Sequence, residues 1–140
     1  MSNEKQAASV LMRPAWRAFS LHFFAILVFL VGPALNPDAL LTPVKGQIFA
    51  AIFLVFILLK RYLSFYELTP QHIIIKNMGS APMEFNFDDI RRVDLVQGAI
   101  KQRLGYGSLR IYCQQRLDKP ALMYGILLPD KVRQYILNAS

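Results

Sequence analysis

The chain has 140 residues, of which 54% are apolar, and the apolar excess lies in its first half. This composition excludes both a disordered chain and an ordinary small soluble domain. The net charge is +7, but many basic residues flank the apolar runs, where membrane proteins carry their anchors. We therefore expect membrane lipids as partners and exclude nucleic acid.

Two apolar runs follow each other in the first part of the chain, Ala18–Leu35 and Val44–Leu63. As helices they would reach about 27 Å and about 30 Å, close to the thickness of a hydrocarbon core. We expect residues 1–63 to form an N-terminal segment and a hairpin of two transmembrane helices. Because proline lacks an N–H and fixes φ, we expect the first helix to end near Pro33.

Basic and aromatic residues stand at the membrane-interface ends of both runs. These anchors are Arg13, Trp16, Arg17, Lys60 and Arg61. The link Asn36–Thr42 contains only Asp38 among charged residues, so the positive-inside rule predicts both termini in the cytoplasm of a bacterium. The expected location is the inner membrane, with two passes. An alternative is a cleaved signal peptide within Met1–Ala34, although a second apolar run follows at once.

From residue 64 the pattern changes to short strands separated by turn residues. We expect strands at Ser64–Leu68, His72–Lys76, Glu84–Phe87, Val93–Gln97, Ser108–Cys113 and Ala121–Leu128. In the fifth strand Leu109, Ile111 and Cys113 should be buried, and the alternating Ser108, Arg110 and Tyr112 should face water. The sequence then predicts a helix that begins at Pro129-Asp130. We expect Val132, Tyr135 and Ile136 to be buried against the sheet.

Residues 64–140 therefore predict an α+β roll of antiparallel strands closed by one C-terminal helix. The remaining concentration of basic residues lies within this part of the chain. These residues, Lys101, Arg103, Arg110, Arg116 and Lys119, are a possible lipid or partner surface. A solvated surface is one interpretation, and a surface that meets anionic headgroups or an acidic partner is the other.

No residue pattern indicates catalysis, so we do not expect an enzyme, a metal site or a cofactor. Asp88 and Asp89 are adjacent, which does not provide the separation that a catalytic pair needs; we expect them to end a strand or a turn and to meet Arg91 or Arg92. Cys113 should be a buried apolar residue. An intramembrane cofactor protein using His22 is a remote alternative, because haem or metal needs further ligands.

Several runs of the second part resemble a known family. They are Tyr66–Thr69, Ile73–Lys76, Ile90–Val93 and, most distinctively, VQGAIKQRLGYGSLRI at Val96–Ile111. These residues are similar to the bacterial pleckstrin-homology (PH) domain family, second type, in which two transmembrane helices often precede the domain. The chain departs from the pattern of phosphoinositide-binding PH domains at the turn Asn77–Pro82, which lacks the basic residues often found there.

The resemblance implies a PH-like roll on the cytoplasmic side of the membrane. We expect a non-catalytic interaction or scaffolding module in an inner-membrane assembly, with a protein partner or a second copy of the chain. The alternative is peripheral sensing of anionic lipid headgroups by the basic surface of the domain. Resemblance at the level of the fold does not choose between them.

Overall fold

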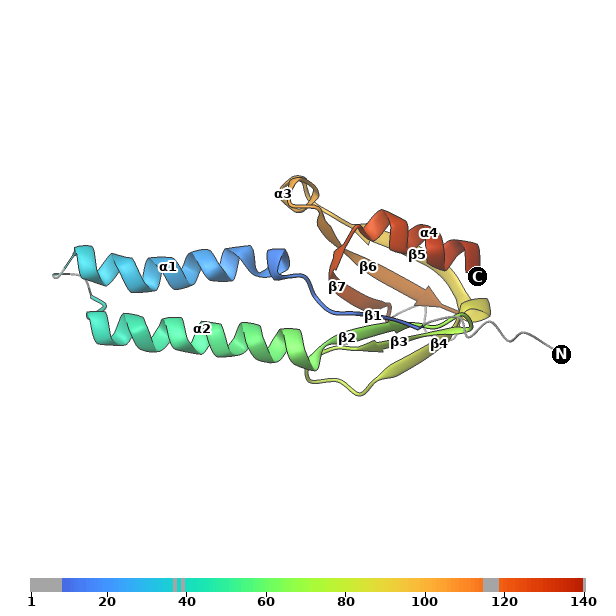
Figure 1. Cartoon of the computed structure of the whole chain (residues 1–140), viewed down its shortest axis with the longest axis horizontal. Helices are drawn as coiled ribbons and strands as arrows, with labels where there is room; N and C mark the ends of the chain where they lie inside the picture. Colours follow the sequence, from blue (N-terminus) through green and yellow to red (C-terminus); the bar gives the residue numbers. More distant parts are fainter. Residues whose placement is uncertain (1–8, 37, 39, 115–118, 140) are drawn as a thin grey trace.

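A computed structural model of the chain describes residues 9–36, 38, 40–114 and 119–139. Two parts are visible: a long helical hairpin, and a domain of two antiparallel sheets with a C-terminal helix (Figure 1). The expected α+β roll is present. The strands before and after the hairpin lie on the same side of it, as does the C-terminal helix.

The hairpin consists of a short 3-10 helix η1 (Trp16–Phe19), α1 (Ser20–Leu35) and α2 (Pro43–Leu63). The helical segment formed by η1 and α1 together, Trp16–Leu35, and α2 are each long and apolar enough to cross a membrane, by length and composition. Only 17% of the most apolar window of each helix is buried. Most apolar side chains of the hairpin therefore lie on its outer surface, unlike those of a core helix in a soluble protein.

The first helix was expected to end near Pro33, and α1 ends two residues later, at Leu35, so that Pro33 lies in its last turn. Pro33 has no N–H to donate to the carbonyl of Phe29, four residues earlier. Gly46 of α2 packs against this place: a Cβ there would lie 2.2 Å from the Phe29 oxygen and 3.0 Å from the Pro33 ring. Close contact with α2 thus covers the point at which the helical ladder of α1 is interrupted.

The first sheet has the order β1-β2-β3-β4, and every pair is antiparallel. Its strands are β1 (Val10–Met12), β2 (Phe65–Leu68), β3 (His72–Lys76) and β4 (Met83–Asn86). Val10 pairs with Leu68 and Met12 with Tyr66. The hairpin is therefore inserted between the first two strands of this sheet.

The second sheet has the order β5-β6-β7, again antiparallel. Its strands are β5 (Ile90–Val96), β6 (Tyr106–Cys113) and β7 (Ala121–Leu127). The 3-10 helix η2 (Phe87–Asp89) connects the two sheets, and a short helix α3 (Ala99–Arg103) connects β5 to β6. The C-terminal helix α4 (Pro129–Ala139) begins at the expected residue.

One core fills the space between the sheets, and α4 covers one of its ends. Ile136 is fully buried and Val132 packs against the core, as predicted. The prediction for Tyr135 is wrong, since this residue is 49% exposed and only meets the edge of the Phe87 ring. Ser108 is also buried rather than wet, because a register shift between Gly107 and Leu109 breaks the alternation of β6.

A buried tyrosine joins the two sheets. The Tyr66 hydroxyl on β2 accepts a hydrogen bond from the backbone N–H of Tyr124 on β7, at 2.8 Å. Asn77 donates to the Leu122 carbonyl at 2.9 Å, and its own oxygen lies 3.2 Å from the Tyr66 hydroxyl. Burial raises the pKa of the Tyr66 phenol to about 12. The hydroxyl therefore stays protonated and can serve as both donor and acceptor.

Candidate functional site

The predicted interface anchors come together where the hairpin meets the domain. Arg61, in the last turn of α2, donates a hydrogen bond to the Pro14 carbonyl, and its guanidinium lies 4.2 Å from the centre of the Trp16 ring. Arg13 lies 5.5 Å from the centre of the Tyr62 ring. Residues from both ends of the hairpin thus form one cluster.

Arg17 connects this cluster to the turn before β6. Its Nη1 atom donates to the carbonyl of Leu104 at 3.2 Å, so α3 and the glycine turn lie beside η1. A cavity of about 500 Å³ opens here, which we call the junction pocket. Its lining residues are Arg13, Ala15, Trp16, Arg17, Arg61, Gly105, Leu127 and Leu128. The lining combines three guanidinium groups with apolar side chains and contains no carboxylate.

Strand β7 holds the hairpin in place at this junction. The Ala15 N–H donates to the Gly125 carbonyl at 2.7 Å, and the Tyr124 hydroxyl donates to the Ala18 carbonyl at 2.9 Å. The Lys60 ammonium lies 4.4 Å from the centre of the Tyr124 ring. Gly125 has φ +67, and a Cβ there would lie 2.7 Å from that of Ala18. Only glycine fits both the backbone conformation and the close approach.

Of the five other predicted basic residues the structure describes four, and it does not bring these four together. Lys101 and Arg103 lie on α3, at the end of β6 that begins with Tyr106. Lys119 precedes β7 at the opposite end, since Ala121 pairs with Ile111. Arg110 is exposed in the middle of β6, opposite Asp94. Arg116 lies outside the described residues.

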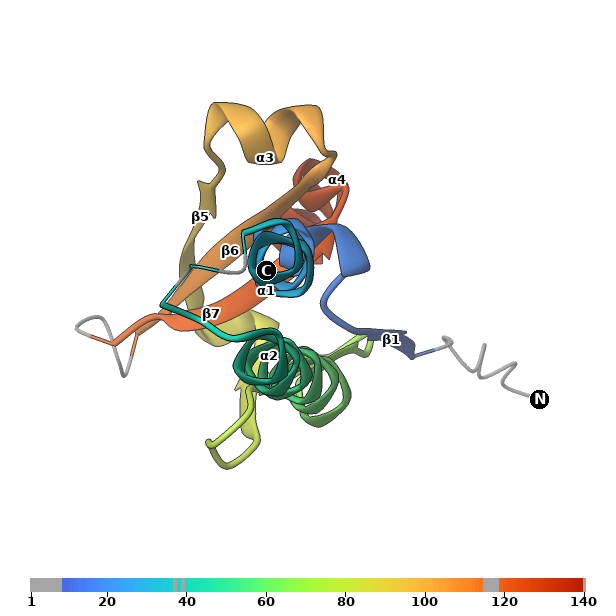
Figure 2. The ribbon, with the colours of Figure 1, turned by 90° about the vertical axis from the view of Figure 1, so that its left-hand side faces the viewer.

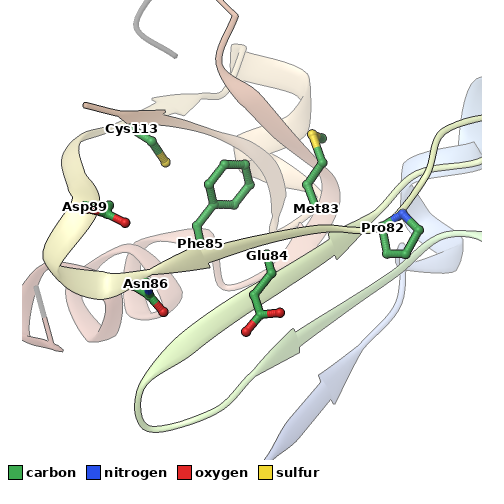
Figure 3. A pocket seen from close by; sticks show the side chains of 7 residues that line it. All are labelled: Pro82, Met83, Glu84, Phe85, Asn86, Asp89 and Cys113. Atoms are coloured by element: carbon green, nitrogen blue, oxygen red, sulfur yellow. The ribbon is translucent and has the colours of Figure 1, made fainter. Parts of the chain in front are cut away.

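A second cavity, of about 470 Å³, lies along β4, which is an edge strand of the first sheet (Figure 3). We call it the edge groove. It is lined by Pro82, Met83, Glu84, Phe85, Asn86, Asp89 and Cys113. Phe85 and Met83 point from β4 toward the second sheet, Glu84 points the other way, and Asp89 and Cys113 face Phe85. The lining has two carboxylates and no basic residue, in a chain whose net charge is +7.

In the described part of the chain, neither His22 nor the aspartate pair lies in a group of side chains suited to catalysis or metal binding. The His22 ring is surrounded by Phe19, Phe53 and Phe56, with ring centres 6.0 to 6.2 Å away. Among the described residues, no group of three His, Cys, Asp or Glu side chains is placed to hold a metal ion. Cys113 is buried, as expected.

Asp88 and Asp89 lie in η2, at the end of β4. The expected contacts with the neighbouring arginines are replaced by others. Arg91 donates to Gln114 at 2.8 Å, and Arg92 forms an ion pair with Asp94 at 2.6 Å. The aspartate pair thus belongs to the turn between the two sheets.

Sequence reasoning named the residues of the arginine cluster, as expected membrane-interface anchors, but missed both cavities. The junction pocket needs Leu127 and Leu128, which lie far along the chain from Arg13 and Arg61. The edge groove depends on which strand lies at the edge of the sheet, and no local pattern shows this. A partial signal was present: Glu84 and Asn86 alternate with Met83 and Phe85, as in a strand with one wet face.

Comparison with protein families matches residues 18–139 to the bacterial PH domain. Comparisons with curated proteins and with solved structures gave no match. The matched range includes all but the first two residues of the hairpin, the glycine turn before β6 and the terminal helix, so the resemblance seen in the sequence is confirmed. The chain belongs to the bacterial PH domain family.

Proposed function

We propose that the protein is a non-catalytic interaction module anchored in the inner membrane of a bacterium, with its PH domain in the cytoplasm. The exposed apolar surfaces of α1 and α2 support membrane insertion. The pairing of β1 with β2 requires both ends of the hairpin to lie on one side. Arg13, Arg17, Lys60 and Arg61 at these ends favour the cytoplasmic side.

The observation that carries an interaction role is the edge groove. An edge strand can add another extended segment to its sheet, which is a common way of binding peptides. Phe85 and Met83 provide an apolar wall, while Asp89, which faces Phe85, provides negative charge. We assign to the groove an extended segment of another membrane-assembly protein, with an apolar side chain flanked by basic residues.

Site-specific photo-crosslinking in bacterial membranes tests this assignment on the full chain. A photoreactive residue is placed at Asn86, beside the groove, and in a control chain at Gln134, which is exposed on α4. We expect a discrete protein adduct from position 86 and none from position 134. Asp89→Lys should remove the adduct because it repels a basic partner.

Asp130→Lys is the matched control for Asp89→Lys, since it makes the same substitution on α4, outside the groove. This variant should keep the adduct. Absence of any adduct at position 86, or an adduct that survives Asp89→Lys, would contradict the assignment. An adduct of twice the mass of the chain would assign the groove to a second copy instead.

Peripheral contact with anionic lipid is a second candidate function, favoured by the position of α3. This helix lies at the end of the domain nearest the hairpin and projects to one side of α1 (Figures 1 and 2). Ile100 is 75% exposed there, next to Lys101, with Arg103 on the same short helix. An exposed apolar residue among basic ones suits a membrane surface.

A dye that reports polarity, attached at Ile100→Cys in a Cys113→Ala chain, tests this contact in liposomes. Its emission should shift to the blue when anionic lipid is added, and the double variant Lys101→Glu/Arg103→Glu should abolish the shift. An unchanged spectrum on addition of anionic lipid would eliminate contact through α3.

A further inference from the structure

We propose that the junction pocket binds the phosphate of one anionic phospholipid, with Arg13, Arg17 and Arg61 as its ligands. The lipid's glycerol and acyl chains would lie along Trp16, Leu127 and Leu128. This inference rests on the membrane insertion proposed above, and it concerns different residues from the edge groove and from α3.

Charge is the first argument. Three guanidinium groups line one cavity without a carboxylate. In the described part of the chain, the two ion pairs are His72–Glu84 and Arg92–Asp94, and neither includes a residue of the pocket. Three neighbouring cations repel one another, and an anion between them removes that repulsion. Arginine also matches the geometry of phosphate oxygens, to which it can donate two parallel hydrogen bonds.

Preorganisation is the second argument. Arg17 is held by the Leu104 carbonyl, Arg61 by the Pro14 carbonyl and the Trp16 ring, and Arg13 by the Tyr62 ring. A guanidinium has five N–H donors, so one backbone bond leaves others for a ligand. Holding the side chains in advance lowers the entropic cost of binding.

The position of the pocket is the third argument, because it selects a lipid rather than a soluble phosphate. Trp16 begins the first apolar helix and Arg61 lies in the last turn of the second, which places the pocket at the depth of the headgroups. Leu127 is 51% exposed and Leu128 57% exposed beside it. Leu128 also has φ 49, a left-handed conformation that is costly for leucine and is common at functional sites.

Trp16 makes the test direct, because it is the chain's only tryptophan and it lines the pocket. The full chain is reconstituted into phosphatidylcholine liposomes, and phospholipids with brominated acyl chains are added as fluorescence quenchers. Brominated phosphatidylglycerol should quench Trp16 saturably and at a lower mole fraction than brominated phosphatidylcholine. Equal quenching by the two lipids would overturn the pocket but not the membrane insertion. Absence of quenching by either lipid would overturn the insertion itself.

Arg17→Gln should raise the half-saturating fraction of phosphatidylglycerol about fivefold, the loss expected for about 1 kcal/mol per basic residue near the surface. Arg110→Gln is the matched control, because it removes the same charge outside the pocket, and it should leave the titration unchanged. Arg13→Gln provides a second pocket variant if Arg17→Gln does not fold. Equal titrations for pocket and control variants would contradict the proposal.

Glycerol 3-phosphate and inorganic phosphate separate the two possible sources of the anion. Neither should reverse the quenching at concentrations that exceed the lipid, because the acyl chains contribute to binding. Complete reversal by inorganic phosphate would identify a soluble-anion pocket and overturn the assignment to lipid.

Discussion

Gly46 allows α2 to pack closely against α1. The contact lies beside Pro33, where the helical hydrogen bonding of α1 is interrupted. Gly46→Ala would place a Cβ 2.2 Å from the Phe29 carbonyl oxygen, so the helices must separate. In a membrane, small residues at helix contacts allow the backbone packing that holds helices together. We expect a lower thermal midpoint in detergent for Gly46→Ala. Gly32→Ala is the control, since its Cβ meets nothing within 4 Å, and an equal loss there would refute the packing argument.

Tyr66 gives the stability of the domain a defined dependence on pH. Burial raises its pKa from 10.0 to about 12, so the folded protein holds the phenolic proton more tightly than the unfolded chain does. This contribution is complete below pH 10 and is lost as the pH rises to about 12. Over that range, denaturation midpoints of the wild type should fall more steeply than those of Tyr66→Phe.

The same substitution also tests whether this phenol is the group responsible. A Tyr66→Phe chain with the same slope as the wild type would show that another group is responsible. At neutral pH the same substitution removes the acceptor of the Tyr124 N–H and should cost about 1–3 kcal/mol.

At the scale of elements, α4 contributes to the core through Ile136 and not through Tyr135. Ile136→Ala removes a fully buried side chain and should lower the free energy of unfolding by about 2–5 kcal/mol. Tyr135→Ala loses a half-exposed ring and one edge contact, so its effect should be clearly smaller. Chemical denaturation of the full chain in detergent measures both variants, and a larger loss for Tyr135→Ala would contradict the observed packing of α4.

Much of the element order could be predicted, because it depends on local patterns. The β-branched run of β3, the alternation of Leu109 and Ile111 in β6, and Pro129 at the start of α4 each carry their own signal. Tyr135 was assigned to the wrong face because it lies next to Ile136 and helical spacing did not separate the two. The burial of Ser108 depends on a bulge, which alternation cannot show.

The strand β1 could not be predicted for a different reason. Val10–Met12 is only three residues long, lies next to basic residues, and pairs with β2 across the whole hairpin. Its pairing with β2 depends on the tertiary fold and leaves no local pattern in the sequence. The same is true of the junction pocket, whose arginines were recognised as anchors while its apolar wall came from a distant strand.

At the scale of the molecule, insertion of the hairpin between β1 and β2 ties the domain to both of its helices. The first helix is joined along the chain to β1 and the second to β2, and these strands pair with each other. Strand β7 adds the Ala15–Gly125 and Ala18–Tyr124 hydrogen bonds. A domain held at several points keeps a fixed orientation relative to the hairpin, unlike one on a flexible linker. In the orientation proposed above, the junction pocket and α3 face the headgroups and the edge groove faces the cytoplasm.

Cysteine labelling in intact bacteria tests the central claim, a membrane-crossing hairpin inserted into a cytoplasmic PH domain. Single cysteines at Ser9, Asp38 and Asn138 are introduced into a Cys113→Ala chain, because these three positions are exposed. A membrane-impermeant thiol reagent added outside should label position 38 and should label positions 9 and 138 only after the inner membrane is opened. Labelling of positions 9 and 138 in cells with an intact inner membrane, or of only one of them, would contradict the account.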